Sequence, residues 1–223
     1  MLNLPTLLNL LMVNNYLAWD EKTITDFSDE NINSLYNKGY VFTREHLGSM
    51  YQTRSLRIDL SKFELSSENR RILRRTENLK IKIIDLPYSG YHWSIGKMAK
   101  DFYDTKFGDG TFSANKIKKL LTTKHNFNRL FIYNNGVGYA ICHETNKLLH
   151  YSYPFYNLQS KISNLGMGMM LKAIVWAKEN NKKYIYLGSA QRPGDVYKLQ
   201  FTGLEWFDEK IWKTDLEELK QIL

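Results

Sequence analysis

The order of elements between residues 129 and 207 restricts the fold more than any other feature of the chain. RLFIYN and VGYAICHE flank NNG, which is typical of a tight hairpin, and KLLHYSYPFY follows as a third β-rich run. A helical run over 167–180 and a strand, YIYLG over 184–188, come next. One or two helical turns, a stop at Gly203 and a last strand complete the order. We therefore predict an α+β protein whose mixed, largely antiparallel central sheet is flanked by helices.

The helix over 167–180 begins at a glycine-rich loop, SNLGMG, in which Gly166 and Gly168 lie one residue apart. Glycine lets the backbone approach a ligand closely, and free N–H groups at a helix N-terminus attract anions. A tight contact between the helix and a strand would use the same glycines. The apolar stripe of the helix indicates core packing and comprises Met167, Met170, Leu171, Ile174 and Val175. The loop therefore holds either a phosphate or no ligand at all.

Four arginines lie on one predicted helix, LSSENRRILRRTE over 65–77, which Ser66 can cap and whose first turn suits Glu68. At helical spacing they fall within an arc of about 140°. They are Arg70, Arg71, Arg74 and Arg75. Like charges this close repel one another unless an anion lies across them, and no acid four residues away balances them except towards Glu77. We predict a phosphate-binding face; a solvated face is the alternative.

Composition limits the kinds of site that the chain can build. The 223 residues carry a net charge of +8 and a single cysteine, Cys142. The charge suits an anionic partner or plain solubility. One cysteine excludes a disulfide framework and a cysteine-built metal site, so we expect no metal. The apolar run at the N-terminus is too short to span a bilayer, so we expect a packed helix in a cytoplasmic protein without membrane contact.

The order of meander, glycine loop, helix, strand, short helix and strand resembles the core of the GNAT acyltransferases. In that fold the loop follows the pattern [Gln/Arg]-x-x-Gly-x-[Gly/Ala]; Gly166 and Gly168 match its last two fixed positions, and Ser163 replaces Gln or Arg. DLPYSG at 85–90 is the best candidate boundary. The resemblance thus implies a GNAT-like core over 85–223 and an N-terminal α/β extension over 1–84 that carries the arginine helix, packed as one compact unit.

Residues 32–212 resemble the arginyl- and leucyl-tRNA–protein transferases. The arginine block and a closing Tyr-Lys-x-x-Phe-x-x-Leu-Glu motif are the most specific parts of this resemblance. The matching positions are Leu35, Tyr36, Gly39, Tyr40, Arg57, Ile58, Phe63, Ser66, Arg70, Arg71, Leu73, Arg74, Arg75, Tyr153, Phe155, Asn164, Leu165, Gly166, Tyr186, Leu187, Gly188, Tyr197, Lys198, Phe201, Leu204 and Glu205. The chain departs from the family at its cysteine positions, where Met50 and Thr53 stand, and at Asp195, where a methionine is common. These departures leave the acceptor open.

The resemblance implies transfer of Arg or Leu from aminoacyl-tRNA to the N-terminal α-amine of an acceptor protein or peptide with an acidic first residue, as in N-degron tagging. The partners would be aminoacyl-tRNA and the acceptor, with no cofactor beyond the donor. An acyl-CoA-dependent N-acetyltransferase and a non-catalytic tRNA-binding relative are the alternatives. Which amino acid is moved, which amine accepts it and the oligomeric state stay open.

The resemblance also assigns roles to residues. Candidate acid–base groups are Tyr197, Glu144, Asp195 and His143; Tyr197 would protonate the leaving ribose oxygen. Lys198 would bind phosphate or an acceptor carboxylate, and Arg57 would bind the carboxylate. The remaining substrate-binding candidates are Tyr153, Asn164, Leu165, Gly166 and Gly168. The four arginines would contact tRNA.

Overall fold

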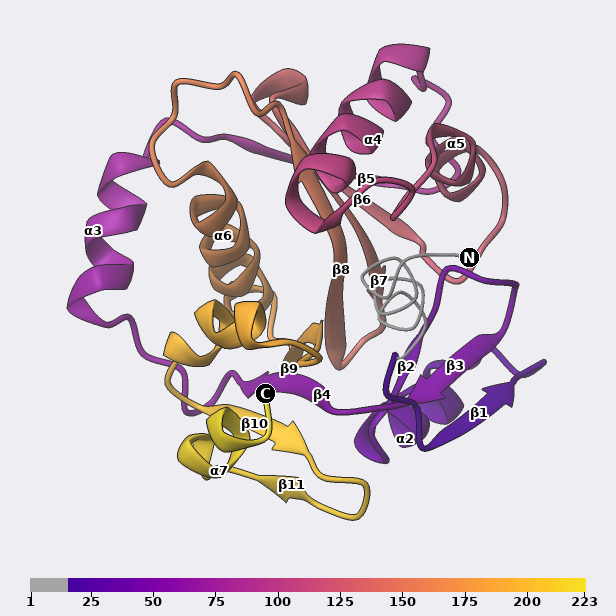
Figure 1. Ribbon diagram of the computed structural model, residues 1–223, viewed down its shortest axis with the longest axis vertical. Coiled ribbons are helices and arrows are strands. Elements are labelled where there is room, and N and C mark those ends of the chain that lie inside the picture. The colour runs from indigo at the N-terminus through magenta and orange to yellow at the C-terminus, as the bar shows by residue number, and fades with distance from the viewer. Residues whose placement is uncertain (1–15) are drawn as a thin grey trace, which may run out of the picture.

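The computed structural model describes residues 16–223 (Figure 1), so the apolar N-terminal run, predicted to be a packed helix, lies outside the described residues. The centre is an eight-stranded sheet in the order β11-β10-β4-β9-β8-β7-β6-β5. The bounds are β4 Ser55–Asp59, β5 Ile81–Asp85, β6 Arg129–Tyr133, β7 Gly138–Glu144, β8 Leu148–Tyr156, β9 Tyr184–Ser189, β10 Leu204–Phe207 and β11 Trp212–Lys213. The pair of β8 with β9 is parallel and the other pairs are antiparallel. The predicted α+β class and mixed, largely antiparallel sheet are confirmed.

Helices cover both faces of this sheet, as Figure 1 shows. The helices are α2 Asp29–Asn37, α3 Ser67–Arg75, α4 Trp93–Phe107, α5 Ala114–Thr122, α6 Leu165–Glu179 and α7 Leu216–Gln221, with short 3₁₀ segments η1 Asn134–Gly136 and η2 Pro193–Gln200. One hydrophobic core joins α3, α6 and α7 to the sheet, and a second joins α2, α4 and α5 to its other face. Alternation along β6 divides it between the two: Phe131 belongs to the first core and Leu130 to the second.

The predicted meander and crossover are present. β6, β7 and β8 pair in antiparallel order, and η1 forms the turn at NNG. α6 then connects β8 to the parallel strand β9. The arginine helix also forms as expected: the Ser66 hydroxyl accepts from the Asn69 N–H at 3.1 Å, and the Asn69 side chain returns a capping-box contact.

A three-stranded sheet, in the order β1-β3-β2, lies beside the main sheet and packs with α2. Its strands are β1 Asp20–Thr23, β2 Tyr40–Phe42 and β3 Ser49–Gln52. The boundary expected at residue 84 falls inside β5, while β4 lies between β9 and β10. The residues before and after that boundary therefore share the main sheet and its cores.

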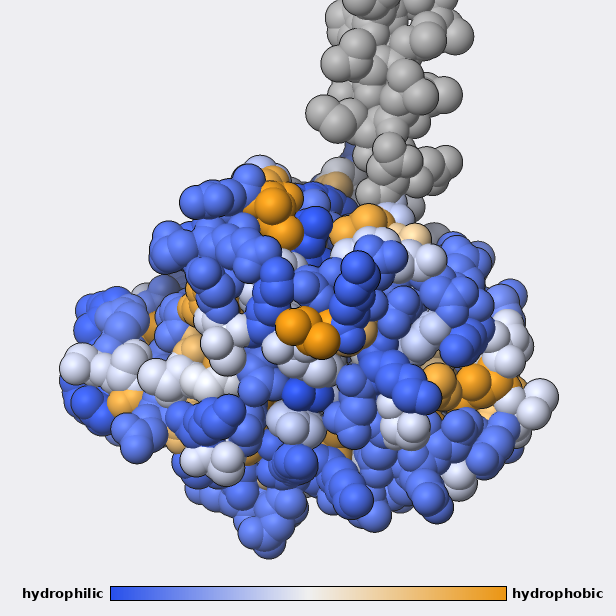
Figure 2. Space-filling view, turned by 90° about the horizontal axis from the view of Figure 1, so that it is seen from below, coloured by the Kyte–Doolittle hydropathy of each residue, from blue (hydrophilic) through white to orange (hydrophobic). Residues whose placement is uncertain are grey.

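The exterior is mostly polar. Figure 2 shows the molecule from below, where hydrophobic residues form only small, separate patches among the described residues. Within residues 16–223, none of the helices is long and apolar enough to cross a membrane.

Candidate active site at the opening between β8 and β9

The two parallel strands separate after three paired positions. Pairing ends at His150 and Tyr186, yet β8 continues to Tyr156 and β9 continues to Ser189, which pairs with β4 instead. Gly188, close to the end of β9, has a φ of +76°, and a methyl group added there would meet no atom within 4 Å. The ends of β8 and β9 therefore diverge, and we call the place of this divergence the opening; the Tyr16 hydroxyl reaches Ser189 Oγ there at 2.7 Å.

A β-bulge on β8 faces this divergence. In the ladder with β7, Ile141 pairs with Tyr153 while Cys142 pairs with Tyr151, so Ser152 is an extra residue. Bulges bend a strand, leave a residue without its ladder partner and often occur next to active sites. The bulge also moves Tyr153 and Phe155 to the face opposite Tyr151.

The N-terminus of α6 lies at the same end of β8. Asn164 adopts a left-handed φ of +59°, and its carbonyl accepts from the Gly168 N–H at 2.8 Å. The Asn164 side chain forms no capping hydrogen bond. The N–H groups of Leu165, Gly166 and Met167 fall in the first turn, where a helix offers them no partner. These three groups, together with the helix dipole, can accept an anion.

The glycine pair itself is explained by packing. A methyl group added at Gly166 would lie 2.9 Å from Tyr156 Cε1, and one at Gly168 would lie 2.5 Å from Thr76 Cγ2. Gly166 therefore admits the end of β8, and Gly168 admits the end of α3. Neither glycine has a left-handed backbone. The tight-contact interpretation thus accounts for both glycines, and any capacity for phosphate rests on the N–H groups.

The four arginines of α3 are not equivalent. Arg71 pairs with Glu68, its Nε lying 2.6 Å from Oε2, and Arg70 donates to the Leu65 carbonyl. The expectation that no acid four residues away balances the block did not consider i,i+3 pairs, and Glu68 pairs with Arg71 at that spacing. Arg74 and Arg75 are exposed and form no ion pair within residues 16–223. They directly precede Thr76, which touches Gly168, so these two arginines lie beside the start of α6.

Asp195 and Lys198 are partners of each other. Asp195 Oδ1 lies 2.9 Å from Lys198 Nζ, and Oδ2 accepts from the N–H groups of Gln191 at 2.9 Å and Arg192 at 3.2 Å. Burial raises the pKa of Asp195, but Lys198 and the two N–H groups outweigh it and hold the pKa below its ordinary value. Lys198 also donates to the Ser189 carbonyl at 2.9 Å. This pair therefore fastens η2 to the end of β9, so Asp195 is a poor base and Lys198 is not a free cation.

Tyr197 lies between these two residues in sequence but has a different environment. Its side chain is 42% exposed, and its hydroxyl forms no hydrogen bond within the described part of the chain. Partial burial raises the pKa of Tyr197 to about 12, with smaller contributions from Asp195 and Tyr156. The hydroxyl is therefore protonated at neutral pH and available as a donor.

Glu144 lies at the other end of the sheet. It closes β7, whereas Gly138, at the start of β7, packs against Met169 of α6. Its carboxylate contacts Arg129 Nε at 2.5 Å and Lys182 Nζ at 2.6 Å. The structure thus does not bring Glu144 to the opening. His143 is next to it, fully buried, with Nδ1 2.7 Å from the Asn126 carbonyl.

Arg57 is also occupied. Its guanidinium contacts Glu205 Oε2 twice at 2.8 Å and lies between the rings of Tyr184 and Trp212, at 4.0 and 3.8 Å from their centroids. It is only 7% exposed. The Arg57 guanidinium is therefore not free to bind an acceptor carboxylate, which is the role predicted for it. Tyr153 packs against Phe112 and Phe127, and burial raises its pKa.

Two features of the opening are not predicted from the sequence. The bulge at Ser152 carries no glycine, and the one available signal was Pro154, which cannot donate to a ladder and favours irregular strand positions. Gln191 was also missed. Its side chain donates to Thr53 Oγ1 at 2.8 Å and accepts from the Leu17 N–H at 2.9 Å, which ties three distant segments together.

Two curated proteins are similar to the chain over most of its length, and both are named aspartate/glutamate leucyltransferase. The one from Pseudoalteromonas atlantica is 22% identical in an alignment of 219 positions that covers 89% of this chain and 92% of that protein. The one from Saccharophagus degradans is 21% identical in an alignment of 170 positions that covers 71% of this chain and 70% of that protein. No protein-family model matches the chain. These distant relatives support a transferase.

Solved structures show weaker likeness. L-PGS from Bacillus licheniformis has a TM-score of 0.45 and 15% identity, covering 72% of this chain and 52% of that chain. A GCN5-related glucosamine N-acetyltransferase region of a fungal multi-domain β-N-acetylglucosaminidase has a TM-score of 0.46 and 11% identity, covering 83% of this chain and 22% of that chain. Likenesses of this size are no basis for assigning an activity.

Proposed function

We propose that the protein transfers leucine or arginine from an aminoacyl-tRNA to the N-terminal α-amine of an acceptor protein or peptide with an acidic first residue, as in N-degron tagging. The observation that carries the proposal is the similarity to two aspartate/glutamate leucyltransferases over most of the chain. The opening between β8 and β9 supplies a place for the reaction. Leucine is the first choice because both relatives are named for it.

The donor would enter from the side of α6. The terminal phosphate of the tRNA would bind the free N–H groups of Leu165, Gly166 and Met167, where the helix dipole favours an anion. Arg74 and Arg75, exposed beside this turn, would bind the next phosphates of the acceptor strand. Both contacts would orient the aminoacyl ester towards the opening, and positioning supplies much of the rate when the ester is already activated.

In the chemical step the neutral α-amine nitrogen bonds to the ester carbonyl carbon, and the bond from that carbon to the ribose oxygen breaks. The nitrogen releases one proton to solvent water, and the ribose oxygen gains one from the protein, which recovers a proton from water. Tyr197 would donate the proton to the ribose oxygen, because its hydroxyl is protonated at neutral pH and has no partner among the described residues. Asp195 and Lys198 would hold η2, and with it Tyr197, against β9.

A transfer assay tests the proposal. Purified protein is mixed with tRNA charged with labelled leucine or arginine and with peptides whose first residue is Asp, Glu, Ala or Lys. We expect label on the Asp and Glu peptides and not on the same peptides with an acetylated N-terminus. Absence of label on every peptide, with tRNA binding intact, would support the non-catalytic alternative. Labelling from acetyl-CoA instead would identify an acetyltransferase.

A further inference from the structure

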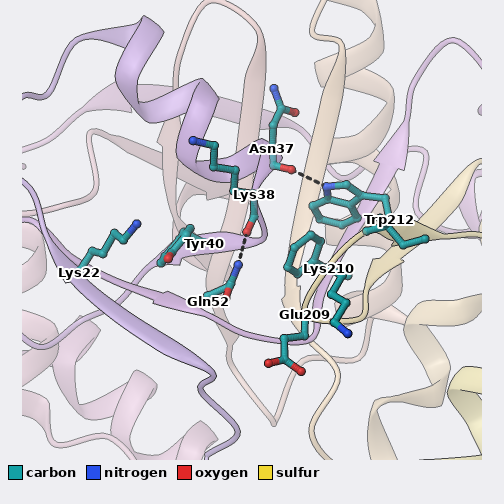
Figure 3. A pocket seen from close by; sticks show the side chains of 10 residues that line it. Lys22, Asn37, Lys38, Tyr40, Gln52, Glu209, Lys210 and Trp212 are labelled. Carbon is teal, nitrogen blue, oxygen red and sulfur yellow. Dashed lines mark hydrogen bonds between the residues drawn. The ribbon is translucent and has the colours of Figure 1, made fainter.

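A separate pocket lies at the same end of the strands of the main sheet as the opening. It has a volume of about 420 Å³ and lies between the three-stranded sheet and the turn that joins β10 to β11 (Figure 3). Three aromatic side chains and three lysines line it: Tyr40, Phe207, Trp212, Lys22, Lys38 and Lys210. Tyr40 and Phe207 are buried, so the lysines stand above an aromatic floor. The mechanism proposed above uses none of these residues.

The charge of the pocket favours a carboxylate. Neither Lys38 nor Lys210 forms an ion pair within residues 16–223. Lys22 Nζ lies 4.6 Å from the centre of the Tyr40 ring and 3.9 Å from Asp20, whose carboxylate also accepts from the Tyr40 hydroxyl. Glu209 is the one acid among the lining residues. Three lysines and one glutamate thus line the pocket, and the surplus positive charge attracts an anion.

The walls of the pocket are fixed before any ligand binds. Trp212 Nε1 donates to the Asn37 carbonyl at 2.8 Å, and Gln52 Nε2 donates to the Lys38 carbonyl at 2.8 Å, as Figure 3 shows. Beneath Trp212, Arg57 is already paired with Glu205. The buried guanidinium therefore supports the pocket, and Lys38 and Lys210 are the lining cations without an ion pair within residues 16–223.

The position of the pocket relates it to the opening. Ser189 at the end of β9 pairs with Ser55 of β4, and Trp206 of β10 pairs with Leu56 of β4. Phe207 and Ser189 therefore lie at the same end of these strands, and the pocket beside Phe207 is two strands away from β9. Two strand spacings are about 10 Å, and β8 adds about 5 Å. An extended polypeptide advances about 3.3 Å per residue. A chain whose α-amine lies in the opening therefore brings roughly its third to fifth residue to the pocket.

We propose that this pocket binds an acidic side chain of the acceptor polypeptide, several residues beyond the amine that receives the amino acid. The inference rests on the proposed function and adds a second recognition site to it. The lysines would select a carboxylate, and the aromatic floor would hold its methylene groups. An acceptor would thus be recognised both at its first residue and at a downstream acid.

Paired peptides test this inference. Each pair shares an acidic first residue and differs by Glu or Gln at one position from three to six. The wild-type protein should show a KM about fivefold lower for Glu at one of these positions, since an exposed ion pair contributes up to about 1 kcal/mol. Lys38→Gln with Lys210→Gln should remove the difference and leave kcat unchanged. Lys118→Gln with Lys119→Gln, on exposed positions of α5, is the matched control and should keep it.

Binding of the same fluorescent peptides, measured by anisotropy, separates this inference from the proposed function. If no peptide accepts leucine, the proposed function fails, and a fivefold preference for the Glu peptide that the double variant loses would still support the pocket. Equal affinity of the wild-type protein for Glu and Gln peptides at every position would overturn it. So would a double variant that keeps the preference, or one that loses tRNA affinity instead. Lys38→Arg with Lys210→Arg should restore the preference, which excludes a folding defect.

Discussion

The two ends of the β7–β8 pair differ in whether their polar side chains already have partners. At the end near α6, which we call the open end, β8 separates from β9 and a bulge interrupts its ladder with β7; the Tyr197 hydroxyl there has no partner in the described chain. At the other end, which we call the closed end, Glu144 is held by Arg129 and Lys182. A carboxylate that satisfies two cations contributes to stability and has little freedom to move protons. Unused donors, rather than the presence of acids, therefore distinguish the end suited to chemistry.

The largest effect is expected at the open end. Tyr197→Phe removes one hydroxyl and almost no packing, so a proton donor lost there should slow transfer by about 10²- to 10⁴-fold. Single-turnover transfer from pre-charged tRNA, at saturating tRNA and peptide, measures the chemical step apart from binding. Affinity for tRNA should stay unchanged. Transfer at the parental rate would make Tyr197 a packing residue and remove the distinction between the two ends.

Residues at the closed end should instead determine how the free energy of unfolding changes at acid pH. Burial lowers the pKa of His143 to about 4 and that of His150 to about 3, from an ordinary value of 6.5. Between these values the unfolded chain binds protons that the folded chain does not, so the free energy of unfolding decreases as pH falls. The loss should begin near pH 6.5, level off only below about pH 3 and reach roughly 3 kcal/mol or more.

Urea unfolding at several pH values measures this loss. The neighbouring acids Asp29 and Glu144 raise the pKa of His143 by less than burial lowers it, and burial also lowers the pKa of His125. His150→Gln should therefore flatten the pH dependence only in part. A free energy of unfolding that is constant from pH 6.5 to 4.5 would contradict the neutral, buried state of this histidine pair.

Glu144→Gln should separate stability from activity. Glutamine keeps the shape and an acceptor oxygen but leaves the Lys182 ammonium, whose side chain is 8% exposed and which also donates to the Thr145 carbonyl at 2.6 Å, without a charged partner. We expect a loss of about 2 kcal/mol in the free energy of unfolding, less than for a fully buried pair. Below the unfolding transition, kcat should remain within about twofold of the parent. A large decrease in kcat of the folded variant would return Glu144 to the list of acid–base groups.

Periodicity and turn residues were enough to predict most of the elements of this fold. Three local patterns are present in the structure as predicted: the NNG turn, the helix cap at Ser66 and the apolar stripe of α6. Each depends on residues close together in sequence. The bulge at Ser152 was not predictable, because an extra residue is defined by the partner strand and not by the strand itself. The boundary expected at 84 also depends on long-range pairing. DLPYSG is a local loop signal, whereas the pairing of β4 with β9 joins segments that are distant in sequence.

The candidate site was harder to predict, because a residue type does not reveal which partners are already bound. Lys198 and Arg57 match family positions and Asp195 departs from one, yet each is engaged in an ion pair with a residue of this chain. Glu68 suits the first turn of its helix by sequence, and its bond to Arg71 depends on the i,i+3 geometry of the folded helix. Sequence matching thus located the segments that form the opening, while the structure was needed to show which groups there are free.

The smallest expected effect compares two pairs of arginines on α3. Arg74 and Arg75 lie beside the open end and are unpaired within the described residues, whereas Arg70 and Arg71 are bound to the Leu65 carbonyl and Glu68. Arg74→Gln with Arg75→Gln should weaken tRNA binding about tenfold at low salt. It should also reduce the slope of log affinity against log salt by about one for each lost phosphate contact.

Arg70→Gln with Arg71→Gln is the matched control, since it removes the same charge from the same helix. It should change tRNA affinity and the salt slope much less, because these side chains already have partners and lie further from the first turn of α6. Filter binding across a salt series measures both quantities. Equal effects of the two pairs would indicate that the helix attracts RNA through its total charge. The distance of each arginine from the open end would then be irrelevant, and the phosphate path proposed from α6 to α3 would be wrong.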